Sequence, residues 1–233
     1  MRRRYAFLWV FVFICIGCSS KGKGFNRGEL KKQIGVVNPV TDDAEIAKTL
    51  KRKSNLPKPF KLAVYFKNPV QSRVANPAWR WSEEDKEALL QMIEKLKSEK
   101  VVSQVFPIIN SLVQEEDIKS VRMAAAKHGA DAVLIFSGIA DVDRYINHWG
   151  WTYILLAPAL FVPGSKADTL FLANASMWDV RNEFLYITAE SEGIDENTYI
   201  AAFGENDKFL IEKAKKNALN KLADQIEKMI KGQ

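Results

Sequence analysis

The sequence predicts an α/β fold, in which a mixed sheet of about six strands is covered by helices. Short apolar runs alternate with amphipathic stretches in the order β-α-β-α-β over residues 60–138. That order builds a parallel sheet with helices on its faces. Three more apolar stretches, joined by short polar connections, follow over residues 151–193 and are typical of antiparallel strands. A long amphipathic helix over residues 206–230 closes the domain.

The first strand and the helix after it carry clear local signals. Residues 60–66 are apolar at both odd and even positions, as expected for a strand buried on both faces. The helix over residues 82–100 has Ser82 at its N-cap and Asp85 three residues later, the spacing of a capping box. Its apolar stripe contains Leu89, Ile93 and Leu96.

The remaining elements follow in order along the chain. "VVSQVFPII" is the second strand, residues 115–131 form a helix that ends at Gly129, and "AVLIFSG" is the third strand. Strands over residues 151–162, 169–180 and 183–193 are joined by turns at "PGSKAD" and "RN". The closing helix places these residues on one face: Ile211, Ala214, Ala218, Leu222, Ile226 and Met229.

The first twenty residues are predicted to direct export. Three arginines at residues 2–4 precede an apolar run over residues 5–16. A membrane-spanning helix needs ~20 apolar residues, so this run is too short, and it is typical of a secretory signal peptide. We expect residues 1–17 to be the signal peptide, residues 18–58 a basic linker with a short helix after Thr41 or Asp42, and residues 59–233 a single α/β domain.

The junction Ile16-Gly17-Cys18-Ser19 resembles the lipobox of bacterial lipoproteins, although Cys15 stands where that pattern usually has Leu. The resemblance implies cleavage between Gly17 and Cys18, and acyl chains such as palmitate on Cys18. Two or more acyl chains anchor a protein stably to a membrane. Because no Asp follows Cys18, the enterobacterial pattern implies sorting to the outer membrane, on its periplasmic face. An uncleaved short anchor and an ordinary signal peptide with a chance cysteine are the alternatives.

Charge is distributed unevenly along the chain. Residues 21–61 carry 11 basic and 4 acidic residues, whereas residues 62–233 carry 20 basic and 24 acidic residues. The basic excess therefore lies in the linker, which argues against nucleic-acid binding by the domain. A basic linker beside a lipid anchor is attracted to anionic headgroups, or it is simply solvated. Cys15 and Cys18 are the only cysteines, so the mature domain has no disulfide and no thiolate metal site.

The strings "KLAVYF", "GADAVLIF" and "WDVRNEFLY", followed by a closing helix, resemble the TolB amino-terminal-like and curli-secretion-lipoprotein-like α/β domains. A closer resemblance is to the rhombotarget-type envelope lipoproteins, and it rests on Trp151-Thr152, Pro163-Gly164, Asp168-Thr169 and Asp179. It covers about residues 60–195. The resemblance implies the fold and an envelope location, but it implies no activity for any of these residues.

The usual catalytic and metal-binding motifs do not occur. The sequence contains no G-x-S-x-G, H-E-x-x-H or P-loop motif, and His128 and His148 have no ligand or base at a suitable spacing. Asp141 and Asp143 are expected in a loop after the third strand, where parallel sheets can bind ligands. "DVDRYINHWG" begins like a calcium loop, but Tyr145 occupies a ligand position, which favours a plain polar loop. We expect no enzyme activity, cofactor or metal.

Two aromatic stretches are candidates for contact with a partner or a membrane. Residues 149–162 contain Trp149, Trp151 and Tyr153 and form a buried strand, a partner-binding edge strand or a lipid-contacting arm. Trp79 and Trp81 lie in a loop, where exposed aromatic residues often anchor interfaces.

The sequence therefore predicts a non-catalytic, lipid-anchored envelope protein that binds another envelope protein. The alternative is a subunit of an oligomeric outer-membrane secretion or transport complex, possessing a membrane- or subunit-contacting arm over Trp149–Val162. A third interpretation is a hydrolase or ligand-binding domain that uses Asp141 and Asp143.

Overall fold

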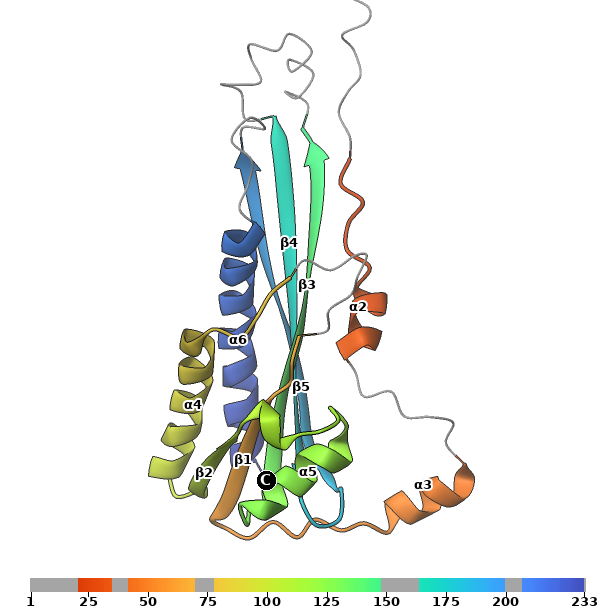
Figure 1. Cartoon of the computed structure of the whole chain (residues 1–233), viewed down its shortest axis with the longest axis vertical. Coiled ribbons are helices and arrows are strands. Elements are labelled where there is room, and N and C mark those ends of the chain that lie inside the picture. The colour runs from red at the N-terminus through yellow and green to blue at the C-terminus, as the bar shows by residue number, and fades with distance from the viewer. Residues whose placement is uncertain (1–20, 35–41, 70–77, 148–163, 200–206, 233) are drawn as a thin grey trace, which may run out of the picture.

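A five-stranded mixed sheet forms the centre of the computed structural model (Figure 1), which describes residues 21–34, 42–69, 78–147, 164–199 and 207–232. The elements in chain order are α2 (Arg27–Ile34), α3 (Asp43–Leu50), β1 (Phe60–Phe66), α4 (Glu83–Ser98), β2 (Val102–Ile108), the 3-10 turn η1 (Asn110–Leu112), α5 (Ile118–Lys127), β3 (Ala132–Ile146), β4 (Ser165–Asp179), β5 (Leu185–Tyr199) and α6 (Asp207–Lys231).

The strand order is β2-β1-β3-β4-β5, which confirms the predicted α/β fold with a mixed sheet. β1 pairs in parallel with both β2 and β3, as the β-α-β-α-β pattern predicts. β3, β4 and β5 are 15 residues long each, pair antiparallel and extend well beyond the parallel part as a long ladder. At one end of this ladder Ile146 pairs with Ser165, and Ser165 pairs with Tyr199. We call this end the ladder tip.

Helices cover both faces of the sheet (Figure 1). On one face α4 and α6 bury their apolar stripes against β1, β3, β4 and β5, and this is the largest core cluster. On the other face α5 covers the parallel strands, and α2 covers the ladder with Leu30 and Ile34. Every residue of β1 except Lys61 is buried, because helices lie on both of its sides.

Local signals set the helix ends as predicted. The Ser82 hydroxyl accepts the Asp85 amide, and the Asp85 carboxylate accepts the Ser82 amide at 2.8 Å, which completes the capping box of α4. Asp42 caps α3 by accepting the Ala44 amide at 2.9 Å. Gly129, which follows α5, has a φ of 68°, a conformation that glycine adopts without strain.

α6 lies unusually close to β5. A Cβ atom added to Gly193 would lie 2.0 Å from the carbonyl oxygen of Ala214 and 2.7 Å from the amide nitrogen of Ala218. The glycine therefore lets the backbones of helix and strand approach each other directly. Ala214 and Ala218 on α6, which are small and fully buried, also allow the helix to lie this close to the strand. Met229, expected on the inner face of α6, is exposed, and Ile230 is buried instead.

Three expectations need correction within the described residues. β3 continues to Ile146, so Asp141 and Asp143 lie in a strand rather than in a loop. β4 begins at Ser165 and pairs with β3, so residues 165–168 are strand and the predicted turn at "PGSKAD" is wrong there. The linker expected over residues 18–58 contains α2, which packs against the sheet. The strand expected over residues 151–162 lies outside the described residues.

No helix in the described ranges has both the length and the hydropathy needed to cross a bilayer.

Candidate functional site

The face of the ladder on which α2 packs carries a row of acidic side chains. Cross-strand register and the alternation of side chains along each strand place the following carboxylates on this one face: Asp141, Asp143, Asp168, Glu190, Glu192 and Glu196. On this face of β5, acids occupy positions 190, 192 and 196, and exposed Ile194 lies between the last two. Such a row favours a basic binding partner.

The basic N-terminal segment lies on this acidic face. We call residues 21–34 the strap; it contains five Lys and Arg residues and one Glu. Arg27 Nε lies 2.8 Å from Glu192 Oε2, and Lys31 forms an ion pair with Glu190. Leu30 and Ile34 are buried against Ile139, Leu170 and Leu172 of the ladder, and Phe25 packs beside them. Charge and apolar contact therefore fix the strap to the sheet.

Asp143, a weak polar-site candidate from the sequence, binds the strap backbone. Its Oδ2 accepts the Gly24 amide at 2.7 Å. Burial raises the pKa of the neighbouring Asp141 carboxyl, and the charge of Asp143 acts in the same direction, although the Val142 amide bonded to Asp141 opposes them.

Across the ladder, the hydroxyl of Tyr145 donates to Asp168 Oδ2 at 2.9 Å, and this bond raises the pKa of Tyr145. Asp143, like Asp168, is thus engaged by a donor of the protein itself. In the described part of the chain no three His, Cys, Asp or Glu side chains are grouped so that they could hold a metal ion.

Trp79 and Trp81, the candidate partner anchors, are partly buried and pack against the main core. Their ring centroids are 5.0 Å apart in an edge-to-face arrangement, and Trp79 meets Phe171 in the same way at 4.8 Å. The indole N–H of Trp81 donates to the Lys67 carbonyl at 2.8 Å. Both side chains are thus directed inward, Trp79 onto Phe171 of β4 and Trp81 onto Phe66 of β1. Trp149, Trp151 and Tyr153 lie outside the described residues.

A buried lysine joins the Trp79 loop to α6. Lys215 is fully buried, and its Nζ lies 2.7 Å from both Asp85 Oδ2 and Glu212 Oε2. The same ammonium donates to the Arg80 carbonyl at 2.9 Å and lies 5.9 Å from the centroid of Trp79. Its charge is therefore balanced by carboxylates and a carbonyl, as a buried cation requires.

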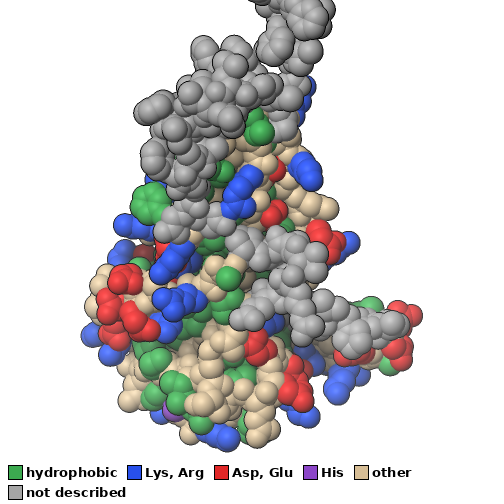
Figure 2. Space-filling model, turned by 45° about the horizontal axis from the view of Figure 1, so that its top comes forward, with side chains coloured by type: hydrophobic (Ala, Val, Ile, Leu, Met, Phe, Trp, Pro, Cys, Tyr) green, Lys and Arg blue, Asp and Glu red, His purple; other side chains and the backbone are tan. Residues whose placement is uncertain are grey.

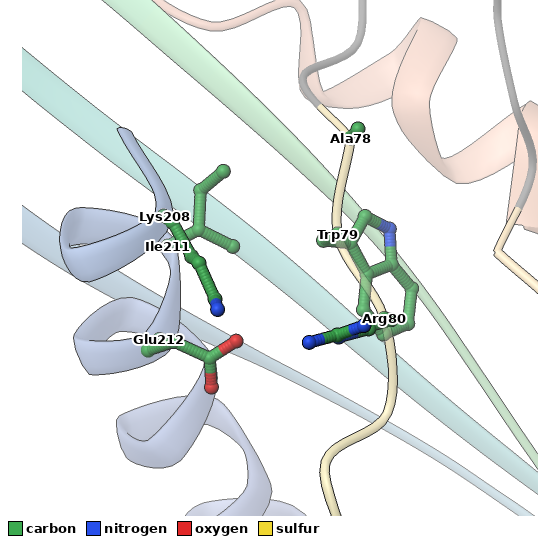
Figure 3. A pocket seen from close by; sticks show the side chains of 6 residues that line it. All are labelled: Ala78, Trp79, Arg80, Lys208, Ile211 and Glu212. Carbon is green, nitrogen blue, oxygen red and sulfur yellow. The ribbon is translucent and has the colours of Figure 1, made fainter. Parts of the chain in front are cut away.

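A cavity of about 200 Å³ lies beside this cluster, between residues 78–80 and the start of α6. Figure 3 shows the Arg80 and Glu212 side chains pointing toward each other across it, with Lys208 and Ile211 on the helix side and Trp79 opposite. Pockets that enclose small-molecule ligands are usually ~300–1,000 Å³, so this cavity is below the size of a typical ligand site.

The β4–β5 turn, at the end of the ladder opposite the tip, is held by Asp179. This side chain is fully buried, and its Oδ1 accepts the amides of Arg181 and Asn182 at 2.7 and 3.1 Å. Its Oδ2 accepts the hydroxyl of Tyr186 at 2.5 Å. Burial and this bond raise the pKa of Tyr186 to about 12. The aspartate that the sequence resemblance singled out thus organises the turn.

The same turn fixes the chain just after the C-terminal end of α3, which we call the base of α3. The side-chain amide of Asn182 donates to the Lys53 carbonyl at 2.8 Å. Arg52 Nη2 lies 3.0 Å from Glu183 Oε2, and Glu183 also forms an ion pair with Arg122 of α5. The segment that follows α3 is therefore fixed to the body of the domain, although α3 itself projects away from it (Figure 1).

α3 exposes every one of its side chains. Ile46 is 47% exposed and Leu50 is 81% exposed, and they lie one turn apart on the same side of the helix. Other exposed apolar side chains, Ile109 and Met123, lie just after β2 and on α5. In Figure 2 charged side chains of both signs are interspersed over the visible face, and hydrophobic side chains reach the surface mostly toward its lower end.

No family model and no curated protein matches the chain. Among solved structures, a homolog of neuraminyllactose-binding hemagglutinin from Helicobacter pylori aligns at 13% identity and a TM-score of 0.36, over 76% of this chain and 87% of that one. The hypothetical protein CT253 from Chlamydia trachomatis aligns at 9% identity and a TM-score of 0.36, over 75% and 99%. Lipoprotein GNA1162 from Neisseria meningitidis aligns at 13% identity and a TM-score of 0.32, over 74% and 99%. These TM-scores are too low to carry an argument about function.

Sequence reasoning missed two features of the site, the strap and the Lys215 cluster. A signal for the strap was present, because Asn26 is followed three residues later by Glu29, the spacing of a capping box at the start of a helix. In the structure Asn26 Oδ1 accepts the Glu29 amide at 3.2 Å. The acids that recur on one face of β5 were a second signal, because they indicate a binding surface for a basic segment such as the strap. Lys215 carried no signal, because its helix contains lysines on every side and only tertiary packing buries this one.

Proposed function

We propose that the protein is a lipid-anchored component of the bacterial envelope that acts by binding another protein rather than by catalysis. The observation that carries the proposal is the exposure of α3, an amphipathic helix that buries no side chain of its own. An isolated helix of eight residues is marginal in water. A binding partner that covers Ile46 and Leu50 would supply the missing burial.

The partner best suited to α3 is a protein with an apolar groove. Two apolar side chains one turn apart are the usual anchors when a helix binds in such a groove. The N-terminal end of α3 carries Asp42, Asp43 and Glu45, whereas Lys48 and Lys51 lie toward its C-terminal end. A groove with basic residues at one end and acidic residues at the other would fix the direction of binding.

The geometry of the ladder acids also supports binding rather than catalysis. A general acid or base must reach a proton of its substrate. Here the Asp143 carboxylate accepts an amide of the strap, and the Asp168 carboxylate accepts the Tyr145 hydroxyl. These side chains stabilise the protein's own structure.

Site-specific photo-crosslinking tests the proposed partner surface. A photoreactive amino acid at position 50 should give one discrete protein adduct in cells. The same residue at position 48, on the opposite side of α3, is the matched control and should give none. Substituting Ile46 with Asp should abolish the adduct without changing the melting temperature, because Ile46 is exposed in the domain. Absence of an adduct from position 50, or an adduct with lipid alone, would contradict the proposal.

Intact mass and membrane fractionation test the proposed anchor. The wild type should begin at Cys18, carry a triacyl adduct and sediment with membranes, whereas Cys18→Ala should be soluble after a salt wash. If Cys18→Ala stays in the membrane fraction, a contact other than the lipid anchors the protein.

The second candidate function is a subunit of an oligomeric secretion or transport complex in the outer membrane. Its arm over Trp149–Val162 lies outside the described residues. The observation that favours it is that apolar side chains are exposed elsewhere than on α3, namely Ile109 after β2 and Met123 on α5. A head-to-tail contact that buried α3 of one copy against these side chains of the next would generate a ring when the rotation between copies closes. A stable high mass in mild detergent, and a position-50 adduct of twice the chain mass, would support this alternative over the first.

A further inference from the structure

We propose that the ladder tip faces the lipid surface and that the long strands stand along the membrane normal, with α3 directed away from the membrane. This inference rests on the proposed lipidation of Cys18. It adds an orientation, which lipidation alone does not provide, because a lipid on a free linker allows any face of a domain to approach the membrane.

The first step in the argument is that the strap is fixed to the ladder. Three kinds of contact hold it: the ion pairs of Arg27 and Lys31 with β5, the hydrogen bond from Gly24 to Asp143, and the burial of Leu30 and Ile34. Exposed ion pairs alone contribute little. Leu30 and Ile34 are as buried as core residues, so they provide most of the attachment.

The second step is the direction in which the strap runs. Ile34, at its C-terminal end, belongs to the cluster that contains Ile139, near the middle of β3. Gly22, at its N-terminal end, lies against Asp143 and Tyr145 near the ladder tip. A Cβ atom on Gly22 would lie 2.9 Å from Asp143 Oδ2 and 3.0 Å from the ring of Tyr145. Followed toward its N-terminus, the strap thus leads to the tip.

The third step is the short distance left to the anchor. Cys18 precedes Gly22 by four residues, which span at most about 14 Å at ~3.5 Å per residue. Asp143 is eleven residues from Ala132 at the opposite end of β3, which corresponds to about 36 Å at ~3.3 Å per residue. The lipid on Cys18 therefore reaches the tip and does not reach the β4–β5 turn or the base of α3.

Basic side chains lie near the tip together with the carboxylates Asp143, Asp168 and Glu196, and the basic ones suit contact with anionic headgroups. Lys21, Lys23 and Arg144 are exposed there, and Lys166 is half-buried. Figure 2, whose view brings this end forward, shows several Lys and Arg side chains in the upper part of the molecule. Lipid phosphates attract such groups over about a Debye length.

Site-specific fluorescence quenching in vesicles tests the orientation. The mature chain has no cysteine besides Cys18, whose thiol would be blocked by lipid, so one new cysteine can be labelled alone. Thr198→Cys places a fluorophore at the tip, and Lys127→Cys places it at the end of α5 near Ala132; both residues are exposed. The lipidated full-length variants are reconstituted into phosphatidylethanolamine–phosphatidylglycerol vesicles that contain a lipid with a nitroxide on its headgroup.

We expect the label at position 198 to be quenched several-fold more strongly than the label at position 127. Equal quenching at both positions, or stronger quenching at position 127, would overturn the orientation while leaving the anchor intact. Intact mass of the same samples separates the two claims, because a chain that lacks the acyl adduct contradicts the proposed anchor rather than the orientation. If the adduct is present and neither label is quenched, the orientation is also wrong, since the tip would then lie away from the headgroups.

A strap variant provides the matched control. Arg27→Glu combined with Leu30→Ser removes an ion pair and an apolar contact of the strap, and it leaves Cys18 and both labelled positions unchanged. The difference in quenching between positions 198 and 127 should disappear in this background, although the acyl adduct persists. A difference that survives release of the strap would show that the strap does not set the orientation.

Discussion

Replacing Gly193 with Ala should destabilise the domain by forcing α6 away from β5. The added Cβ would lie 2.0 Å from the carbonyl oxygen of Ala214 and 2.7 Å from the amide nitrogen of Ala218. Both neighbours are backbone atoms, so rotation of a side chain cannot relieve the contact. The helix must move by on the order of 1 Å or more to reach an ordinary van der Waals separation.

The size of the effect follows from what α6 buries. Ile211, Leu222 and Ile226 lie in the main core with exposed fractions of 1% or less, and they move with the helix. Overpacking of a filled core costs up to about 3 kcal/mol in typical cases. A domain of this size loses ~2–4 °C in melting temperature per kcal/mol, so we expect a fall of up to about 12 °C.

The assay is thermal unfolding of the full chain in detergent, followed by far-ultraviolet circular dichroism and tryptophan fluorescence. Gly28→Ala is the matched control, because the nearest atom to a Cβ at Gly28 is Asn26 Oδ1 at 3.7 Å. Alanine in the helix α2 should be neutral or should stabilise the protein by up to ~1 kcal/mol. If Gly193→Ala melts together with Gly28→Ala, the close approach of α6 to β5 is not as described.

Three further predictions concern buried groups. Lys215→Met leaves two carboxylates without their buried cation, and it should lower the free energy of unfolding by about 3 kcal/mol in urea titrations; an unchanged urea midpoint would contradict this. Burial and the bond to Asp179 raise the pKa of Tyr186 from 10.0 to about 12, so its contribution to stability is complete below pH 10 and is lost as the pH rises through 12. Tyr186→Phe should therefore show a smaller loss of stability than the wild type between pH 10 and pH 12, when urea midpoints are compared. Leu30→Ala should make the strap sensitive to trypsin by removing a buried contact, whereas Leu50→Ala, at an exposed position, should leave the digestion pattern unchanged.

The elements whose signals are local could be predicted from the sequence. β1 has apolar residues on both faces, and the structure buries both faces between helices. The caps formed by Ser82 and Asp42 depend on side chains that bond amides two or three residues away, so a short window of sequence contains the whole signal. The turn after Asp179 was also expected, and its hydrogen bonds likewise stay within a few residues.

The features that were missed depend on contacts between distant residues. β3 extends through Asp141 and Asp143 because β4 pairs with it along its full length, and a polar strand of this kind is stable only beside its partner. The strap depends on charges and apolar residues more than one hundred positions away. The sequence pattern near residue 27 shows a basic segment, but it does not show the acidic face that binds it.

The alternation of acids along β5 also affects how neighbouring copies behave. Among the strands that the structure describes, β5 is an edge strand of 15 residues, and a long edge invites pairing with the edge of another molecule. Glu196 would repel the acids of a second copy, and Glu190 and Glu192 are already paired with Lys31 and Arg27 of the strap, which lies beside this edge. β2, the other edge, is short and contains Pro107, which cannot donate a hydrogen bond. Among the described strands, the two edges of the sheet therefore both carry features that disfavour edge-to-edge pairing between copies.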